Sequence, residues 1–404
     1  MSRSNLLFIL TGSIAAYKAC DVISQLVQRG HRIRTVATPS ALRFVGPATL
    51  EGLTGEPVRS DLYAAGQALD HIALTRWADA VVLCPATAHT LNQLAAGLAP
   101  DLTGALFLAH DRSKPFLIAP AMNPAMWAHP ATVASVEKLT GWGLRFIPVA
   151  AGRTACGEDG AGRLAEPALI VASVEAALAR PARRLRVLVT GGGTAEPIDA
   201  VRVLTNTSSG RTGALLAARF VLAGHEVLLL RARTAAPAPP LCREEVFSTF
   251  AELDAALSRI LAAESFDLVL HAAAVGDFSA GTPVDHSAKL PSSAAISLDL
   301  RPHPKLLPQL VARSRNAAVI VVAFKLTRGA DEPRARDAVR ALLASGAHYV
   351  VHNDLAQRGA EPDDFPSTLH GPDGSALARC ATRPELAAAI ERAFSSPSAP
   401  PVSN

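Results

Sequence analysis

Two stretches decide the fold, N-L-L-F-I-L-T-G-S at Asn5–Ser13 and R-V-L-V-T-G-G-G at Arg186–Gly193. Each is a short apolar run that ends at glycine and precedes a helical pattern. This is how the first strand of a parallel α/β sheet begins. Two such beginnings predict two domains. The helix-like Leu169–Leu178, followed by proline and arginines at Ala179–Arg184, places their boundary near residue 182.

Further β-rich runs alternate with helical stretches in both halves, including a helix expected at Ser13–Gln28. This alternation indicates parallel sheets flanked by helices, in which ligands bind beyond the carboxyl ends of the strands. We expect domains at residues 1–182 and 183–394, an exposed loop at Thr234–Pro240 and a disordered tail at residues 395–404. The runs are Ile33–Ala37, Ala80–Leu83, Phe116–Ile118, Leu144–Ile147, Val227–Leu230, Leu268–His271, Val319–Ala323 and Tyr349–Val351.

The composition excludes several classes of protein. A hydrophobic content of 49% against 18% charged residues argues against global disorder. Lys and Arg exceed Asp and Glu by 39 − 35 = +4, which is too little to indicate a nucleic-acid partner. The 12 histidines form no zinc-binding pattern, so the sequence names no metal ligands.

The cysteine pattern and the apolar runs predict where the protein works. Five cysteines lie far apart, without C-x-x-C spacing, which argues against a disulfide framework and for a reducing compartment. The sequence shows neither a signal-peptide pattern nor an apolar run approaching the ~20 residues of a membrane span. We therefore expect a soluble, cytoplasmic protein with no membrane partner.

Three pieces of the first half suit a bound cofactor. The G-S turn at Gly12 opens a helix whose free N–H groups suit a phosphate, although a glycine turn with a serine cap is the simpler explanation. P-A-T-A at Pro85–Ala88 follows a strand with small residues that let a flat cofactor approach closely. His71 precedes a helix-like segment and, taken alone, is more simply explained as a solvent-exposed histidine.

Asn123 and Cys156 complete the chemistry of this half. Asn123 lies in P-A-M-N-P after a strand, and its amide suits a substrate carboxylate, though N-P also favours a turn. Cys156 lies in A-C-G-E-D-G-A-G-R-L, whose glycines suit a bending lid and whose Arg163 suits an anionic substrate. A thiol there is a proton donor to carbon, unless it is an incidental surface cysteine.

Together these pieces resemble the flavin-dependent cysteine decarboxylases, in particular 4′-phosphopantothenoylcysteine decarboxylase. The motifs that carry the resemblance are G-S-I-A-A-Y-K, H-I-A-L-T-R-W-A-D, P-A-T-A, P-A-M-N-P-A-M and A-C-G-E-D-G-A-G-R-L, over about residues 5–175. Two positions depart from the family, and we expect both to be peripheral. They are Leu164, where methionine is usual, and His89, where asparagine or aspartate is common.

The resemblance implies a flavodoxin-like domain of the HFCD flavoprotein type, an FMN cofactor, and trimers with flavin near the subunit contacts. It implies that the cysteinyl thiol of the substrate is oxidised to a thioaldehyde, which acts as the electron sink for loss of CO₂. His71 matches the active-site histidine, Asn123 the residue that grips the departing carboxylate, and Cys156 the thiol that protonates the enethiol. The implied FMN contacts are Gly12, Ser13, Ile14, Thr38, Ala86, Thr87, Ala121 and Met122.

The second half carries a glycine run that is not a dinucleotide fingerprint, because G-x-G-x-x-G from Gly191 requires glycine at Glu196. T-N-T-S-S-G at Thr205–Gly210 opens a helix and suits an anion, although a serine-rich cap is the alternative. In H-A-A-A-V-G-D-F, Asp277 suits a nucleotide or its magnesium. Lys289 suits a polyphosphate, or is a solvated loop residue.

This half resembles phosphopantothenate–cysteine ligase, the usual fusion partner of that decarboxylase, over about residues 186–355. The motifs are G-G-G-T-A-E-P-I-D-A-V-R, T-N-T-S-S-G, A-A-A-V-G-D-F, A-K-L-P-S-S, V-A-F-K-L-T and H-N-D-L. The resemblance implies a Rossmann-like domain that joins the carboxylate of 4′-phosphopantothenate to a nucleotide, with release of pyrophosphate. The amine of cysteine then displaces the nucleotide.

The implied co-substrates and residues follow from the same resemblance. The ligase half uses Mg²⁺ and either CTP or ATP, and its domains form dimers. The implied residues are Asn206 and Lys289 for catalysis, Ala272, Ala273, Asp277, Lys289 and Phe324 at the nucleotide, and Ser208, Ser209 and Gly210 at the substrate phosphate.

Several departures leave the choice of nucleotide open. K-L-P-S stands where many members have K-I-K-K, His303–Leu306 where they often have P-D-I, and Thr327 where they have glutamate. P-K-L-L and F-K-L-T are closer to the stand-alone ATP-type ligases. Arg336 and Arg340 lie one helical turn apart and are candidates to replace the missing lysines at the phosphates.

The leading interpretation is a bifunctional enzyme that makes 4′-phosphopantetheine for coenzyme A. Its partners are its small-molecule substrates and further copies of itself, with trimeric decarboxylase domains, dimeric ligase domains and an assembly of up to a dodecamer. One alternative is a flavin decarboxylase whose ligase half is weak or inactive. Another is a non-catalytic, phosphatase-inhibiting subunit of the same superfamily, against which the joint presence of His71, Asn123 and Cys156 argues.

Overall fold

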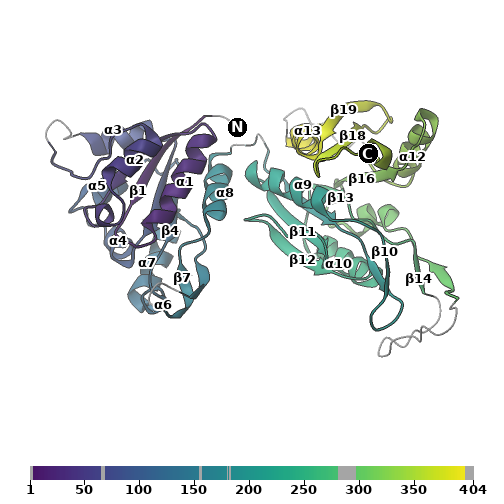
Figure 1. Cartoon of the computed structure of the whole chain (residues 1–404), viewed down its shortest axis with the longest axis horizontal. Helices are drawn as coiled ribbons and strands as arrows, with labels where there is room; N and C mark the ends of the chain where they lie inside the picture. Colours follow the sequence, from purple (N-terminus) through teal and green to yellow (C-terminus); the bar gives the residue numbers. More distant parts are fainter. Residues whose placement is uncertain are drawn as a thin grey trace. The chain divides into compact units, whose positions relative to one another are not determined.

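The computed structural model describes residues 3–64, 69–153, 157–179, 181, 183–280 and 297–395. The chain divides into two compact units, Met1–Ala179 and Arg180–Asn404 (Figure 1). A strand occurs at every run where the sequence predicted one. The helix expected from Ser13 begins only at Ala16.

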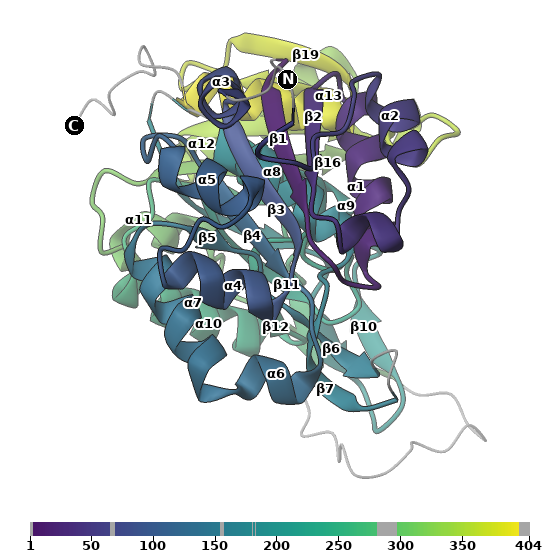
Figure 2. The ribbon, with the colours of Figure 1, turned by 90° about the vertical axis from the view of Figure 1, so that its left-hand side faces the viewer.

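The first unit is built on a parallel five-stranded sheet in the order β2-β1-β3-β4-β5. Alternate residues of β1 point into two cores, one formed with α1, α2 and α8 and the other with α3, α4, α5 and α7. Figure 2 shows this unit in front, with helices on both sides of the sheet. A strand covered on both faces is apolar at every position, which explains the run that opens the chain.

The elements of this unit are β1 (Asn5–Leu10), α1 (Ala16–Gln28), β2 (Arg32–Ala37), α2 (Pro47–Thr54), α3 (Asp70–Trp77), β3 (Ala80–Ala86), α4 (Ala88–Ala95), α5 (Leu102–Ala109), β4 (Phe116–Pro120), α6 (Pro124–Ala128), α7 (Pro130–Gly141), β5 (Arg145–Phe146), β6 (Ala150–Arg153), β7 (Asp159–Arg163) and α8 (Pro167–Leu178). β6 and β7 pair as an antiparallel hairpin outside the main sheet.

The second unit contains an eight-stranded sheet in the order β12-β11-β8-β13-β16-β17-β18-β19. The strands are parallel as far as β17, and β18 and β19 add an antiparallel edge that the sequence did not predict. One face is covered by α9 and α13, and the other by α10, α11 and α12. The sheet is therefore doubly wound, like that of the first unit.

Its elements are β8 (Arg186–Gly191), β9 (Ala195–Pro197), β10 (Val203–Thr205), α9 (Arg211–Leu222), β11 (Glu226–Ala232), β12 (Arg243–Phe247), α10 (Phe250–Ala263), β13 (Leu268–His271), β14 (Phe278–Ala280), β15 (Leu300–Pro302), α11 (Leu310–Arg313), β16 (Ile320–Thr327), α12 (Glu332–Ala344), β17 (Tyr349–Asp354), β18 (Asp364–His370), β19 (Ala376–Thr382) and α13 (Arg383–Ser395).

Two sequence expectations about loops need correction. Residues 234–240 form a loop, but Ala235 in its middle is buried, because it packs against the glycine that begins α9. The predicted tail starts one residue too early, since Ser395 is the last residue of α13 and its hydroxyl donates to the carbonyl of Glu391. Residues 396–404 lie outside the described residues.

A buried histidine joins the first and last helices of the first unit. His31 follows Gly30 at the end of α1, and its Nδ1 accepts a hydrogen bond from the backbone N–H of Ser4 at 3.3 Å. Its Nε2 lies 3.2 Å from a carboxylate oxygen of Glu175 on α8. Arg29 is 3.5 Å from the same oxygen. We call this contact the His–Glu clamp.

The second unit has the same clamp at the equivalent place. His225 follows α9, and its Nδ1 accepts from the backbone N–H of Leu185 at 3.1 Å. Its Nε2 lies 3.7 Å from a carboxylate oxygen of Glu391 on α13. Arg219 donates to the other oxygen of Glu391 at 2.6 Å. The first and last helices of both units are thus tied through one buried histidine.

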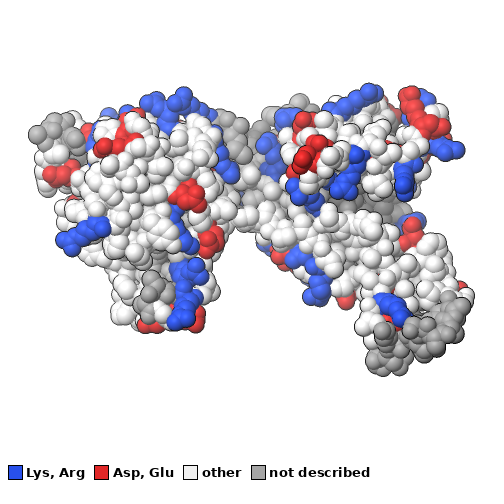
Figure 3. All heavy atoms as spheres, viewed as in Figure 1, with Lys and Arg blue, Asp and Glu red and all other residues white. Residues whose placement is uncertain are grey.

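The charges on one face and the character of the helices complete the description of the fold. Acidic and basic side chains are interspersed on the face drawn in Figure 3, without a broad area of one sign. None of the helices in the described part of the chain has the length and apolar character needed to cross a bilayer.

Candidate active sites

The first unit has a cavity of about 900 Å³ next to the carboxyl ends of β1, β3 and β4. Seven of the eight predicted FMN contacts line it, and the eighth, Ala86, is buried behind it as the last residue of β3. The seven are Gly12, Ser13, Ile14, Thr38, Thr87, Ala121 and Met122. Sequence reasoning therefore located this cavity well, because its wall is made of the turns that follow the strands.

The turn after β1 is held against the turn after β3. Thr11 donates its hydroxyl to the carbonyl of Pro85 at 2.7 Å and accepts from the backbone N–H of Thr87 at 3.1 Å. Thr87 in turn caps α4. Gly12 has no room for a side chain, since a Cβ there would lie 2.5 Å from that of Ser40. The two turns therefore form one continuous part of the cavity wall.

Asn123 lines the cavity from the turn between β4 and α6. Its Oδ1 accepts from the backbone N–H of Ala125, the second residue of α6, at 2.8 Å and so caps this helix. Its Nδ2 donates to Glu158 at 2.6 Å. The neighbouring Met122 donates its backbone N–H to the carbonyl of Gly162 on β7 at 2.9 Å. The β6–β7 hairpin is therefore bonded directly to the turn that carries Asn123.

The glycines of this hairpin have a role that the sequence analysis did not assign. They were expected to let a lid bend, yet two of them lie where the hairpin touches the Asn123 turn. A Cβ at Gly160 would lie 2.9 Å from Pro124, and one at Gly162 would lie 2.7 Å from the carbonyl of Met122. Close packing explains both glycines without a hinge.

The three predicted catalytic residues of this half are not all in one place. Asn123 lines the cavity, whereas His71, the second residue of α3, is not among the lining residues. The Nδ1 atom of His71 is buried and has no hydrogen-bond partner among the described residues. Cys156 lies outside the described residues, between β6 and β7 in the sequence.

The two positions that depart from the family are not peripheral. Leu164 and His89 both line the cavity, the first as a buried side chain and the second as an exposed one in the first turn of α4. Arg163 also lines it and lies 3.8 Å from Glu166. The expectation was wrong because short turns bring residues beside a motif to the same wall as the motif itself.

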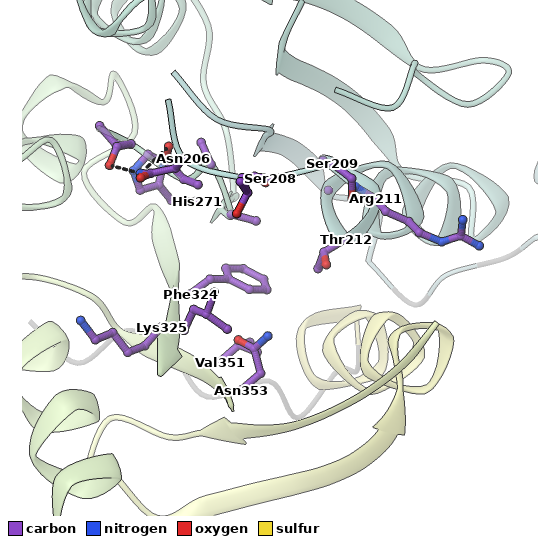
Figure 4. Close-up of a pocket in the computed structure, with 18 of the residues that line it drawn as sticks. Asn206, Ser208, Ser209, Arg211, Thr212, His271, Phe324, Lys325, Val351 and Asn353 are labelled. Carbon is purple, nitrogen blue, oxygen red and sulfur yellow. Dashed lines mark hydrogen bonds between the residues drawn. The ribbon is translucent and has the colours of Figure 1, made fainter. Parts of the chain in front are cut away.

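The second unit has a cavity of about 1240 Å³ at the corresponding edge of its sheet (Figure 4). Every described residue that the ligase resemblance assigns lines it. These are Asn206, Ser208, Ser209, Gly210, Ala272, Ala273, Asp277 and Phe324. Lys289 lies outside the described residues.

Asn206 is fixed by the loop that follows β13. Its Nδ2 donates to the carbonyls of Ala274 at 3.4 Å and Val275 at 3.2 Å, which are drawn as dashed lines in Figure 4. Gly193 allows this approach, because a Cβ there would lie 2.6 Å from the backbone oxygen of Asn206. The side-chain nitrogen is thus committed to the protein, and Oδ1 is the end of the amide that is available to a ligand.

His271 is a cavity-lining residue whose motif was noted but to which the sequence gave no role. It ends β13 and is 8% exposed. Burial lowers its pKa to about 4, so the ring is neutral near pH 7. Its Nδ1 lies 3.0 Å from the hydroxyl of Thr190, which accepts from the backbone N–H of Ala273. This network holds the loop that carries two predicted nucleotide contacts.

Charged side chains surround the rest of this cavity. Asp277 is paired with Lys305, and His303 stacks on Phe250 with ring centroids 4.0 Å apart. All four residues that replace the P-D-I segment, His303–Leu306, line the cavity. The replacement therefore changes the wall of the site itself.

The two arginines predicted to replace missing lysines do not reach the site. Arg336 and Arg340 are exposed on α12 and do not line the cavity. The cations that do line it, besides Lys305, are Arg211, Lys325, Arg358 and Arg383. Lys325 was visible in a motif, but Arg383 begins a helix that the sequence did not predict. No cluster of three His, Cys, Asp or Glu side chains suited to a metal occurs within the described residues.

Comparison with known proteins assigns a family model to each of the two units. The flavoprotein family model matches residues 1–179, and the model of the DNA/pantothenate metabolism flavoprotein C-terminal domain matches residues 182–394. The coenzyme A biosynthesis bifunctional protein CoaBC of Bacillus subtilis (strain 168) is 34% identical over 367 residues, 89% of this chain and 88% of that protein. The chain belongs to the CoaBC family.

Other members and solved structures match parts of the chain. The CoaBC protein of Mycobacterium tuberculosis (strain H37Rv) is 43% identical over 276 residues, and the alignment spans 67% of this chain and 65% of that relative, less than two thirds of its length. The FMN binding protein AtHal3 is 34% identical with a TM-score of 0.39, covering 43% of this chain and 95% of that one. A solved C-terminal domain of a CoaBC protein is 22% identical with a TM-score of 0.43, covering 54% and 97%.

Proposed function

We propose that the chain is a bifunctional enzyme of coenzyme A biosynthesis. The second unit couples 4′-phosphopantothenate to cysteine through an acyl-nucleotide, and the first decarboxylates the product to 4′-phosphopantetheine. The observation that carries this proposal is that each unit has its own cavity, lined by the residues that the resemblance assigns to one of the two reactions. Membership of the CoaBC family supports it.

The cavity of the first unit fits FMN. Its volume is within the range of small-molecule sites. The N–H groups at the turns of Gly12 and Thr87 suit the phosphate, and the apolar Ile14 and Met122 suit the flat ring. Bound FMN supplies reversible two-electron chemistry. The binding of FMN by AtHal3 supports the same cofactor here.

The chain's own residues then handle the carboxylate and the proton. The Asn123 amide, held by the hydrogen bond to Ala125, orients the substrate carboxylate before CO₂ leaves. Cys156 returns a proton to carbon, and its sequence neighbour Arg153 lines the cavity. Because His71 does not line the cavity of its own unit, the proposal includes a trimer in which this ring serves a neighbouring subunit.

In the second unit, the cavity holds the nucleotide, CTP or ATP, and Mg²⁺ beside Asp277. The first helical turn of α9 and the residues Ser208–Gly210 take the substrate phosphate. Asn206 contacts the acyl-nucleotide through Oδ1, since its nitrogen is bound to the loop after β13. Lys289 stabilises the charge that develops as pyrophosphate leaves. Dimers of this unit, a dodecamer and a cytoplasmic location also belong to the proposal.

Two activities measured on the purified chain test this assignment. We expect a flavin absorption band, and release of pyrophosphate that requires phosphopantothenate, with CTP and ATP compared side by side. A colourless protein that releases no CO₂ from phosphopantothenoylcysteine contradicts the assignment of the first unit.

Two variants separate the reactions and serve as controls for each other. Asn206→Asp places a carboxylate next to the carbonyls of Ala274 and Val275, so we expect trapped acyl-nucleotide and a loss of amide formation of about 100-fold. Cys156→Ser should stall the first unit after CO₂ loss and accumulate an oxidised enethiol. Each variant should leave the other reaction unchanged, and full turnover in either would remove its residue from the mechanism.

A decarboxylase with an inactive ligase half is the second candidate. The exposed positions of Arg336 and Arg340 favour it, since these side chains do not restore the missing lysines. It predicts a flavin band and CO₂ release without phosphopantothenate-dependent pyrophosphate.

A further inference from the structure

The cavity of the second unit extends beyond every residue that the ligase resemblance assigns. It continues past the start of α9 to the antiparallel edge of the sheet, where Asn353, Phe365, Ser367, Arg383 and Leu386 line it. Figure 4 shows Phe324 and Asn353 on the strands that face Thr212 at the start of α9. These residues come from β17, β18 and α13, and we refer to this part of the cavity as the edge pocket.

Arg383 is a buried cation in the edge pocket. It is the first residue of α13 and is 8% exposed. Its Nε donates to the hydroxyl of Thr212 at 2.9 Å, its Nη1 donates to the carbonyl of Pro362, and its guanidinium lies 4.6 Å from the ring centroid of Phe365. These contacts orient the guanidinium, but all of them are to uncharged groups, which leaves a buried positive charge to be balanced.

The carboxylate whose charge acts on Arg383 is that of Asp363, and it is shared with a second arginine. Asp363 accepts from Arg211 with both oxygens, at 2.6 and 3.0 Å. Arg358 also lines the cavity, is near enough to Arg383 to lower its pKa, and has no ion pair within the described residues. Arg211, Arg358 and Arg383 thus line this part of the cavity, and the carboxylate that acts on Arg383 is already paired with Arg211, which makes the pocket electropositive.

Ser367 supplies an unused hydrogen-bonding group in the same place. It lies opposite Asn353 across the β17–β18 ladder, so both side chains are on the face that lines the cavity. Its hydroxyl is buried, and the described residues offer it no hydrogen-bond partner. A buried hydroxyl without a partner costs free energy, which a ligand oxygen would recover.

We propose that the edge pocket is an oxyanion subsite, in which Arg383, Ser367 and Asn353 bind one anionic group of a ligase reactant. The inference rests on the proposed ligase function. The phosphate of phosphopantothenate is already assigned to Ser208–Gly210 and its carboxylate reacts with the nucleotide, so two anionic groups remain, the carboxylate of cysteine and a phosphate of the nucleotide. Phe365 and Leu386 exclude water from the pocket, which strengthens the charge-assisted hydrogen bonds to either anion.

Steady-state kinetics of pyrophosphate release on the full chain test this subsite. Ser367→Ala removes the unpartnered hydroxyl without breaking a bond, and Arg383→Gln removes the charge. We expect each to raise the KM of one reactant by about 10-fold with a smaller change in kcat. Arg379→Gln, which removes an exposed arginine outside the cavity, is the matched control and should leave every KM unchanged.

The reactant whose KM rises identifies the anion. An increase for cysteine assigns the pocket to its carboxylate, and an increase for the nucleotide assigns it to a phosphate. Unchanged KM values for all three reactants in both variants overturn the subsite. Equal loss of kcat in both variants without a change in KM also overturns it, because that outcome reports only a structural role.

A binding measurement separates this inference from the proposed function. If the wild-type chain releases no pyrophosphate, the ligase assignment fails, and calorimetric binding of inorganic phosphate then decides the subsite alone. Ser367→Ala and Arg383→Gln should weaken phosphate binding by about 5-fold relative to wild type and Arg379→Gln. Equal phosphate binding by all four proteins contradicts an oxyanion subsite in the edge pocket.

Discussion

The His–Glu clamps of the two units share a histidine but differ in what surrounds the glutamate. In the first unit, Arg29 approaches Glu175 only to 3.5 Å. In the second, Glu391 accepts short hydrogen bonds, 2.6 Å from Arg219 and 2.7 Å from the hydroxyl of Ser395. The comparison teaches that the strength of such a clamp depends on the donors to the carboxylate more than on the histidine.

The donors around each glutamate lower its pKa. Burial alone would raise the pKa of Glu391, but His225, Ser395 and Arg219 outweigh it and lower the pKa to about 2. Burial also opposes ionisation of Glu175, and His31 and Arg29 again lower its pKa. Both carboxylates are therefore ionised at neutral pH and stabilise their units as anions.

The largest expected effect comes from breaking one clamp at a time. Glu391→Leu removes the carboxylate that binds Arg219 and Ser395 and faces His225, and it should destabilise the second unit by about 4 kcal/mol. Glu175→Leu should cost the first unit about 2 kcal/mol, since Arg29 is partly exposed and is solvated when its partner is lost. The measurement is urea unfolding of the full chain, followed by circular dichroism and by tryptophan fluorescence.

The chain provides its own control for this comparison. Its three tryptophans, Trp77, Trp127 and Trp142, are all in the first unit, so fluorescence reports that unit alone. Glu175→Leu should shift the fluorescence midpoint, and Glu391→Leu should shift only the transition seen by circular dichroism. Equal shifts of fluorescence in both variants would show that the units do not unfold separately.

The next effect is on stability in acid. Because the folded pKa of Glu391 is about 2 and its ordinary value is 4.5, its contribution is complete above pH 4.5 and is lost as the pH falls toward 2. The whole titration is worth about 3 kcal/mol in the second unit, of which about 2 kcal/mol is lost between pH 5 and pH 3. Urea midpoints at pH 5 and pH 3 measure it, and Glu391→Gln should lose less than wild type over that interval. An unchanged pH dependence in the variant rules out this source.

A smaller effect sharpens the comparison at the active sites. Gly162→Ala forces a Cβ toward the carbonyl of Met122 at a φ of +139°, so it should displace the turn that carries Asn123. We expect a cost of about 2 kcal/mol to the hairpin and a fall in decarboxylation, with ligase activity unchanged. Gly143→Ala is the matched control, because its φ is +92° but nothing lies within 4 Å. Equal effects of both variants would show that the cause is backbone strain at a positive φ and not the contact with Met122.

The smallest effect is expected from the two exposed arginines of α12, whose loss should leave the KM of the nucleotide nearly unchanged. Arg336→Gln and Arg340→Gln change exposed side chains outside the cavity and should alter the KM of the nucleotide by less than about 2-fold. Lys325→Gln is the positive control, since Lys325 lines the cavity. If KM rises in the two arginine variants as much as in Lys325→Gln, Arg336 and Arg340 do contact the phosphates of the nucleotide.

The sequence predicted the parallel strands other than β12, because they are mainly apolar, as burial on both faces demands. It missed β12, whose residues are mostly charged and exposed. It did not predict β18 or β19. Residues along β18 are alternately half-buried and buried, and Pro366 interrupts the run, while β19 is mostly exposed. These features are typical of a sheet edge. A prediction based on apolar runs does not detect such strands.

The same reason separates the site residues that were found from those that were missed. Gly12 and Asn123 follow predicted strands, and the position at a strand end was enough to place them beside the cavity. Arg383 and Ser367 belong to the edge elements, so no motif pointed to them. His71 shows a different limit, because the motif that assigns it to the active site does not place its side chain at the wall of the cavity in the same unit.

The contacts of Thr327 restrict which side chains fit at its position. Its hydroxyl donates to Asp354 at 2.6 Å and lies 2.9 Å from His352, and Asp354 also accepts from the backbone N–H groups of Gly329 and Ala330, contacts that hold its pKa well below the usual range. A glutamate at position 327, the residue usual in the family, would bring a second anion against this one. A glutamate introduced at position 327 alone would therefore stand against an ionised carboxylate, and a paired change at position 354 would be needed to relieve the repulsion.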